Sequence, residues 1–348
     1  MEPVPIVVPA PPVTVETYQA SHSMVQQVLV GKPKAITSKI TVSDVMDTEL
    51  YIVKSREPLA RARNLMLKTG KTHLLVDDGT GKIIGYVSRR SMMRTLAIKG
   101  PLWRRRTGDP EFLEMVTVFN PPVISPEAGI EEAAAQMLYH NVDALLVKKG
   151  ESLLGMITKD DIAKAYMNNM QGRALVENLM HPGRIGVVSR HHSMNHVVRI
   201  MESNYLDAIV VADGETPLGV ITERRMIYVP IEDRYGGIKR RRVLWVRKLE
   251  RASRKMGRYV KVTPLLAEDF MVKIKRAVTP KTDAVDALKI MFEEDVDGLP
   301  VIEEGRLIGI ITKSDVVREL ARSSVIAMEE RIEETLRQAK MGVKARKP

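Results

Sequence analysis

Residues 309–315, Gly-Ile-Ile-Thr-Lys-Ser-Asp, decide the fold because the same pattern occurs four times in this chain. The other copies are Gly-Tyr-Val-Ser-Arg-Arg-Ser at 85–91, Gly-Met-Ile-Thr-Lys-Asp-Asp at 155–161 and Gly-Val-Ile-Thr-Glu-Arg-Arg at 219–225. Each copy predicts a short apolar strand that contains one glycine, then a Ser or Thr that begins an amphipathic helix. Four copies indicate a repeat architecture.

The same elements precede each copy of this motif. In the second repeat, apolar residues from Ile130 to Leu138 recur at the spacing of one helix face, and residues from Ala284 to Phe292 do the same in the fourth. A short apolar strand follows each such helix, as at 144–147. The repeat is therefore a β-α-β-β-α unit of about 60 residues by typical element lengths. A unit of this size buries too little apolar surface to be stable alone, so we expect the repeats to pair.

The order of elements, the helix face and the terminal Gly-x-x-Ser/Thr-x-x-Asp motif resemble the cystathionine β-synthase (CBS) domain. The resemblance covers residues 41–100, 110–170, 173–230 and 265–322. It implies an α/β fold in which two repeats pack sheet to sheet into a Bateman module with ligand clefts between them. Four repeats would then form two such modules, and such modules often associate, within one chain or between copies.

Three segments lie outside these repeats: an N-terminal Pro-rich extension at 1–40, a basic insertion at 231–264, and a C-terminal helix with a basic tail at 323–348. The extension has five prolines between residues 3 and 12, which predicts an extended rather than a helical conformation. The sequence leaves open whether this extension is disordered or threads into a partner.

The composition excludes several kinds of site. The chain has no cysteine, so it contains neither disulfides nor thiolate metal sites. No apolar run approaches the ~20 residues of a membrane helix, and the first residues lack the features of a signal peptide. The histidines show no convincing metal-ligand spacing, and the repeats leave no room for a catalytic domain. We therefore expect a soluble, cytoplasmic protein with no metal and no catalytic residues.

The Thr and Asp of the motif have two interpretations. Thr158 with Asp161, and Thr312 with Asp315, fit a capping box, in which both residues serve only to start a helix. Capping explains the hydroxyls of all four repeats, but it explains the acids less well, because the first and third repeats lack them. A ligand site retained once in each module explains that difference better.

The same residues suit a nucleotide. A helix N-terminus favours phosphate, a carboxylate one turn into the helix can accept both ribose hydroxyls, and the glycine lets a ligand approach the strand. In CBS-type proteins, which this chain resembles, the Asp holds the ribose and the Thr or Ser contacts phosphate. The resemblance makes a ribose contact doubtful at Ser91 and Arg225, the corresponding residues of repeats one and three. It implies AMP, ADP or ATP as ligand of Thr158, Lys159, Asp161, Thr312, Lys313 and Asp315.

Nearly all of the net charge of +11 lies in residues 239–261, where eleven Lys or Arg stand against one acid, Glu250. We predict a basic helix with one apolar face from Trp245 to Met256. Both tryptophans of the chain stand beside arginine triplets, an arrangement that suits RNA, since arginine pairs with phosphate and tryptophan stacks on bases. The alternatives are a solvated face, or contact with an acidic protein or membrane surface. The candidate RNA-binding residues are Trp103, Arg104, Arg105, Arg106, Lys239, Arg240, Arg241, Arg242, Trp245, Arg247, Lys248, Arg251, Arg254 and Lys255.

Two functions compete. The first is a non-catalytic regulator of translation or dormancy (hibernation) that binds RNA, with ribosomal subunits as the favoured partner and adenine nucleotides as ligands. It draws on a resemblance to archaeal multi-CBS proteins, which include ribosome-associated dormancy factors. The second is a regulatory subunit that senses AMP, ADP or ATP for an enzyme or transporter and binds no RNA.

Overall fold

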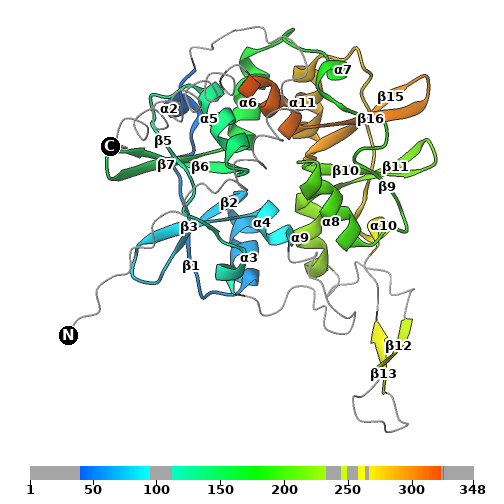
Figure 1. Ribbon diagram of the computed structural model, residues 1–348, viewed down its shortest axis with the longest axis horizontal. Coiled ribbons are helices and arrows are strands. Elements are labelled where there is room, and N and C mark those ends of the chain that lie inside the picture. The colour runs from blue at the N-terminus through cyan, green and yellow to red at the C-terminus, as the bar shows by residue number, and fades with distance from the viewer. Residues whose placement is uncertain are drawn as a thin grey trace, which may run out of the picture. The chain divides into compact units, whose positions relative to one another are not determined.

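The computed structural model describes residues 40–94, 112–232, 244–248, 258–262, 266–322 and 324. The N-terminal extension, the segment with Trp103 and its arginine triplet, and the C-terminal tail beyond Ser324 lie outside these residues. The chain divides into two compact units. Figure 1 labels the helices and strands of the described residues. Unit one comprises Met1–Glu49, Asn120–Ile162 and Val317–Pro348, and unit two comprises Leu50–Phe119 and Ala163–Val316.

Unit one contains repeat two. Its three-stranded sheet has the order β5-β6-β7, with β5 parallel to β6 and β6 antiparallel to β7. Ile130, Ala134 and Met137 are buried, which confirms the predicted apolar face of α5. The elements are α2 (Val42–Val45), β5 (Val123–Ile124), α5 (Ile130–Tyr139), β6 (Ala144–Lys149), β7 (Ser152–Thr158) and α6 (Lys159–Asn169), whose first turn belongs to this unit.

Unit two begins with repeat one, a four-stranded sheet of order β1-β2-β3-β4 that α3 covers. Leu59, Ala62 and Met66 of α3 are buried in the core of this repeat. The elements are β1 (Ile52–Lys54), α3 (Leu59–Thr69), β2 (His73–Asp77), β3 (Ile83–Ser88), α4 (Arg89–Met93), the 3₁₀ helix η3 (Leu113–Val116) and β4 (Val118–Phe119).

Repeat three follows in unit two with a sheet of order β14-β11-β10-β9. Its core takes in Met93 from α4 of repeat one, and Ile227 of repeat three joins the core of repeat one, so α4 and α9 pack together. The elements of this part are α7 (Val176–Leu179), β8 (His181–Pro182), β9 (Val187–Ser189), α8 (Met194–Ser203), β10 (Ala208–Asp213), β11 (Thr216–Thr222) and α9 (Glu223–Glu232).

Repeat four completes unit two with the sheet β15-β16-β8. Ala284, Leu288 and Met291 of α11 are buried, as predicted. A last helix runs over residues 313–322, and its part from Val317 onward belongs to unit one. The elements are α10 (Ala267–Phe270), β14 (Val272–Lys273), α11 (Ala284–Glu293), β15 (Gly298–Glu303) and β16 (Arg306–Thr312).

Short strands are exchanged between consecutive repeats. β4, near the start of repeat two, pairs with β3 of repeat one, while Asp47, near the start of repeat one, bridges to Met156 in repeat two. β8 and β14 are exchanged in the same way between repeats three and four. The exchange links repeat one with two and three with four, in keeping with the two Bateman modules.

The exchanged strands explain the glycine of the motif. A Cβ atom on any of the four glycines would lie less than 3.0 Å from a backbone carbonyl oxygen of the exchanged strand, a distance that side chains essentially never adopt. The sequence interpretation assigned this space to a ligand. In the structure the neighbouring backbone occupies it at Gly85, Gly155, Gly219 and Gly309.

The prediction of a basic helix over 239–261 is wrong for the described residues. β12 (Leu244–Lys248) and β13 (Arg258–Val262) form an antiparallel two-stranded sheet in which Val246 pairs with Val260. The helical spacing of four apolar residues in this segment was misleading. Five of the ten residues in the two strands are β-branched or aromatic and favour strands, and the cross-strand ladder satisfies backbone groups of both strands.

Candidate functional site

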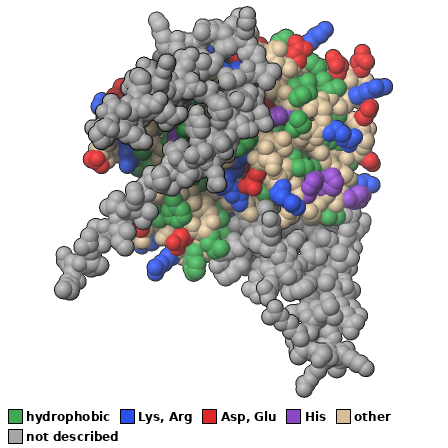
Figure 2. All heavy atoms as spheres, viewed as in Figure 1, with side chains coloured by type: hydrophobic (Ala, Val, Ile, Leu, Met, Phe, Trp, Pro, Cys, Tyr) green, Lys and Arg blue, Asp and Glu red, His purple; other side chains and the backbone are tan. Residues whose placement is uncertain are grey.

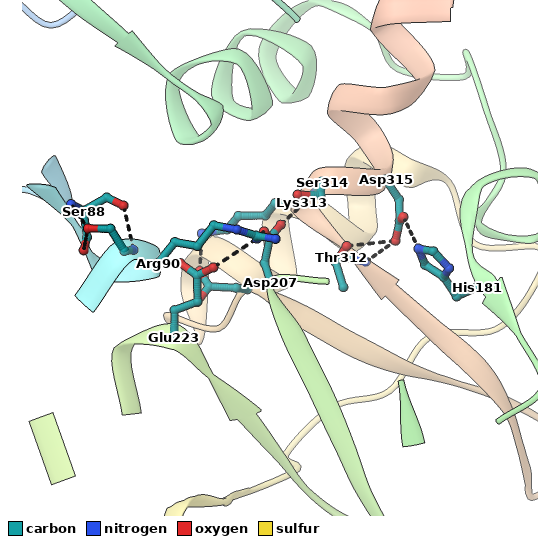
Figure 3. A network of polar contacts seen from close by, with 11 residues as sticks. Ser88, Arg90, His181, Asp207, Glu223, Thr312, Lys313, Ser314 and Asp315 are labelled. Carbon is teal, nitrogen blue, oxygen red and sulfur yellow. Dashed lines mark hydrogen bonds and ion pairs between the residues drawn. The ribbon is translucent and has the colours of Figure 1, made fainter. Parts of the chain in front are cut away.

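The motif of repeat four starts the last helix with a capping box (Figure 3). The backbone nitrogen and Oγ1 of Thr312 lie 2.7 and 2.9 Å from Oδ2 of Asp315. Both residues are buried. A backbone N–H at a helix start has no partner within the helix, so the carboxylate supplies one and also suits the positive end of the helix dipole.

The second carboxylate oxygen of Asp315 is also engaged. Nε2 of His181, in the exchanged strand β8, lies 2.9 Å from Oδ1 of Asp315. The side chain of Asp315 is 0% exposed and that of His181 is 16% exposed. Both oxygens of this carboxylate therefore have a partner from the chain itself.

The two residues between Thr312 and Asp315 have partners as well. Nζ of Lys313 lies 3.0 Å from Oδ1 of Asp297 and 4.5 Å from the centre of the Phe292 ring, close enough for a cation–π contact. The backbone nitrogen of Ser314 donates to Oδ2 of Asp207 over 2.7 Å. A carboxylate of repeat three thus lies where the helix N-terminus would favour an anion.

Repeat two has the same cap in unit one. The backbone nitrogen and Oγ1 of Thr158 lie 3.0 and 2.7 Å from Oδ2 of Asp161. The backbone nitrogen of Asp161 returns a hydrogen bond to Oγ1 of Thr158 over 3.3 Å. Thr158 is buried and Asp161 is half-buried, so this carboxylate is nearer to solvent than that of Asp315.

Repeats one and three show what the cap requires. In repeat one, Ser88 and Ser91 exchange backbone-to-hydroxyl hydrogen bonds of 3.0 and 3.1 Å, so a serine completes the box without an acid. In repeat three, the backbone nitrogen of Arg225 donates to Oγ1 of Thr222 over 3.3 Å. An acid at this position is therefore not needed to start the helix.

Repeat three has a buried ion-pair cluster that the sequence reading missed. Nη1 of Arg90, from repeat one, lies 3.2 Å from Asp207 and 3.3 Å from Glu223. All three side chains are less than 15% exposed. Glu223 stands where the other repeats have Lys or Arg, so it places a second carboxylate beside Asp207, and the guanidinium compensates both.

Models of the family described as "CBS domain" match residues 42–98, 113–168, 176–232 and 267–322, more than half of the chain. This chain belongs to the CBS domain family. Domains of this family commonly bind adenine nucleotides in regulatory roles. The four matches coincide with the four copies of the motif that the sequence predicted as repeats.

Two archaeal proteins are similar to most of this chain. Uncharacterized protein MJ1404 of Methanocaldococcus jannaschii is 26% identical over 80% of this chain, which spans 62% of that protein. An "uncharacterized 33.4 kDa protein in ribosomal RNA operon" of Thermofilum pendens is 23% identical over 76% of this chain and 86% of that protein. Homoserine O-acetyltransferases, among them that of Methanosarcina acetivorans, match 34% to 38% of the chain, which spans 23% to 25% of their length.

A solved structure has the same fold. The crystal structure of protein MJ1225 of Methanocaldococcus jannaschii matches 80% of this chain and 99% of its own, with a TM-score of 0.62 and 18% identity. At this identity the match shows the CBS fold alone. It supports four CBS repeats in a single chain.

The predicted nucleotide-binding residues belong to repeats two and four, and in each of these repeats they lie together at the start of a helix. Thr158, Lys159 and Asp161 lie at the start of α6, and the other three lie at the start of the last helix. The sequence reading missed His181 and Asp207, which contact the repeat-four motif from other elements. Residues 180–182 (Met-His-Pro) of repeat three correspond to residues 46–48 (Met-Asp-Thr) of repeat one. This correspondence was the signal in the sequence that could have identified His181.

The predicted RNA-binding residues are only partly described. Those in the first insertion, and those of the second outside residues 244–248, lie outside the described residues. Trp245, Arg247 and Lys248 lie in β12. Within the described part of the chain, no group of three His, Asp or Glu residues is placed to hold a metal ion, and no helix is long and apolar enough to cross a membrane.

Proposed function

We propose that this CBS protein is a non-catalytic regulator that binds RNA through its basic insertion and an adenine nucleotide through its CBS repeats. Ribosomal subunits are the preferred partner, which would make the protein a translation or hibernation factor. The observation that carries the proposal is the charge distribution: residues 239–261 hold eleven Lys or Arg and one acid, within a chain of net charge +11. Neither the repeat fold nor nucleotide binding requires this segment.

The pairing of β12 with β13 supports the proposal for part of this segment. Trp245 pairs with Lys261, and Arg247 pairs with Tyr259 two positions along. Because residues alternate between the faces of a strand, these four positions fall on one face of the sheet. Aromatic and cationic residues at neighbouring positions suit unpaired bases and their phosphates.

On the face shown in Figure 2, basic and acidic side chains of the described residues are interspersed, and no large patch of one sign is seen there. The relative from Thermofilum pendens, named for its place in a ribosomal RNA operon, supports the choice of ribosomal RNA by association only.

Co-sedimentation of the full chain with ribosomal subunits tests the RNA proposal. The test variant changes Arg247, Lys248, Arg251 and Arg254 to Gln, and the control variant changes four exposed lysines of the repeats. We expect the affinity to fall steeply as the salt concentration rises. The slope of log affinity against log salt concentration should decrease in magnitude by about 0.7 for each phosphate that the test variant no longer binds. Equal affinity of both variants would contradict the proposal. The control positions are Lys68, Lys82, Lys275 and Lys281.

The nucleotide proposal rests on repeat two. A helix N-terminus, a hydroxyl and a half-buried carboxylate meet there, and Lys159 follows the hydroxyl. Phosphate would lie at the helix start and the ribose hydroxyls at Asp161. Calorimetric titration with AMP, ADP and ATP should show binding that Asp161→Asn abolishes, while the melting temperature confirms that the variant is folded.

The alternative function is a sensor of AMP, ADP or ATP that regulates an enzyme or transporter and binds no RNA. The partial matches to homoserine O-acetyltransferases show that related CBS repeats occur within enzymes. Nucleotide binding together with no co-sedimentation at low salt would favour this alternative over the RNA-binding function.

A further inference from the structure

The turn between β9 and α8 of repeat three places three cationic or imidazole side chains on the surface of unit two. Arg190, His191 and His192 are all exposed, and none of them belongs to the predicted nucleotide-binding or RNA-binding residues. Figure 2 shows histidine side chains gathered over α8, with Lys or Arg side chains beside them. The acids of the adjoining α10, Glu268 and Asp269, are half-buried, so the turn presents mainly basic and imidazole groups to solvent.

The hydrogen bonds of the two histidines fix which ring nitrogen carries the proton in the neutral imidazole. The backbone nitrogen of Ser189 donates to Nδ1 of His192 over 3.3 Å. Nε of Arg190 donates to Nε2 of His191, also over 3.3 Å. Because a neutral imidazole has one donor and one acceptor nitrogen, the other nitrogen of each ring carries a hydrogen. Both exposed rings therefore offer an N–H group as a donor.

Two side chains of α8 extend this patch. The ring centroids of His192 and His196 lie 4.6 Å apart in an edge-to-face arrangement. Burial, and then the neighbouring His192 and Arg199, hold the pKa of His196 below its usual value, which places the exposed guanidinium of Arg199 near these rings. Donors suit the oxygens of an anion, whereas a metal ion binds an unprotonated ring nitrogen.

The same turn is bonded to the residues that follow the basic insertion. The backbone nitrogen of Ala267, the first residue of α10, donates to the carbonyl oxygen of His192 over 2.8 Å. The backbone nitrogen of Glu268 donates to that of Arg190 over 3.1 Å. Val262, the last residue of β13, precedes Ala267 by five positions, which the chain can span over at most about 18 Å. The patch therefore lies next to the proposed RNA-binding segment.

We propose that the turn between β9 and α8 is a second RNA-contacting surface, in which Arg190, His191 and His192 donate to phosphate oxygens of the RNA that the basic insertion binds. This inference rests on the RNA binding proposed above. The insertion supplies charge, whereas two neutral imidazoles supply hydrogen bonds. Contacts to phosphate position a nucleic acid without reading its sequence, so this surface orients the RNA against unit two.

Fluorescence anisotropy tests this surface with a labelled oligouridylate and the full chain, at about pH 8, where histidine side chains in general are neutral. His191→Ala with His192→Ala should lower the affinity about tenfold through two lost hydrogen bonds, and should leave the slope of log affinity against log salt concentration unchanged. Arg190→Gln should reduce the magnitude of that slope by about 0.7, for one phosphate. His140→Ala, which removes an exposed imidazole of unit one, is the control and should bind as the wild type does.

A second pair of substitutions separates phosphate contact from base stacking. His191→Phe with His192→Phe keeps two aromatic rings and removes both N–H groups, so it should lose as much affinity as the double alanine variant. Full affinity in either double variant, with RNA binding by the wild type, would overturn this surface and leave the proposed function standing. No binding of RNA by the wild-type chain at low salt would overturn the RNA-binding function, and this surface with it. Melting temperatures confirm that each variant is folded.

Discussion

Repeats two and four share the motif Gly-x-Ile-Thr-Lys-x-Asp, and both use its Thr and Asp to start a helix. Around that common cap they differ. Asp315 is fully buried against His181, whereas Asp161 is half-buried and the exchanged segment places Asp47 at the matching position. The motif therefore accounts for the cap, and residues outside it set how deeply the carboxylate is buried.

Repeat three extends the comparison. Repeat four neutralises Asp297 with its own Lys313, whereas repeat three has Glu223 at that position and relies on Arg90 of repeat one. A buried carboxylate needs a partner, and the partner can come from within the repeat or from a neighbour. The second solution ties repeat one to repeat three.

The largest expected effect is the loss of stability when Arg90 or Lys313, the cations that pair with these buried carboxylates, is replaced. Arg90→Met leaves two buried carboxylates without their guanidinium, and we expect a loss of about 3–5 kcal/mol in the free energy of unfolding. Lys313→Met leaves one carboxylate and should cost less. Urea denaturation measures both, and Glu223→Gln in the Arg90→Met background should restore part of the loss. Equal stability of Arg90→Met and the wild type would contradict the role of the cluster.

The next effect tests the exchanged strands. Gly309→Ala places a methyl group against the carbonyl oxygen of His181, and Gly155→Ala places one 2.7 Å from that of Asp47. We expect each to destabilise by about 1–3 kcal/mol, with the larger value at Gly309, where the approach is closer. Ala135→Gly in α5 serves as the reference for a change of one methyl group. Gly150→Ala is unsuitable as a control, because Gly150 has a φ of +60°, which alanine rarely adopts. Thermal unfolding of the variants measures which of them loses more stability.

A third prediction tests the position of repeat two that matches His181. Asp47 pairs with Met156 as His181 pairs with Ile310, so Asp47→His gives repeat two the residue that repeat four has there. If this imidazole contacts Asp161 as His181 contacts Asp315, nucleotide affinity at repeat two should fall at least tenfold, or about 1.4 kcal/mol. Titration calorimetry measures it, and Asp47→Asn, which removes the charge but adds no imidazole, is the control. Unchanged affinity in Asp47→His would show that the residue at this position does not control nucleotide binding.

The smallest effect addresses the shared cap. Thr158→Val and Thr312→Val each remove an N-cap hydroxyl and should each lower stability by about 1 kcal/mol. Because the cap is common to both repeats and the ligand is not, only Thr158→Val should also weaken nucleotide binding. A loss of binding in Thr312→Val, with its fold intact, would place a nucleotide at repeat four after all.

The repeats were predictable from sequence because their signals are local. The helix faces around Ile130 and Ala284, the apolar strands and the motif hydroxyls each follow from periodicity or from helix capping. The basic insertion was not, because Trp245 and the apolar residues after it fit a helical spacing, while the pairing of β12 with β13 depends on residues ten or more positions apart. Local spacing does not report such pairing.

By itself the sequence determined the four CBS repeats, the caps at Thr158 and Thr312, and the concentration of charge in residues 239–261. Only the tertiary structure decided what surrounds each cap. His181 reaches Asp315, and Arg90 reaches Asp207, across more than 100 residues of sequence. Electrostatic and hydrogen-bonding partners are chosen by distance in space, which a pattern read along the chain does not contain.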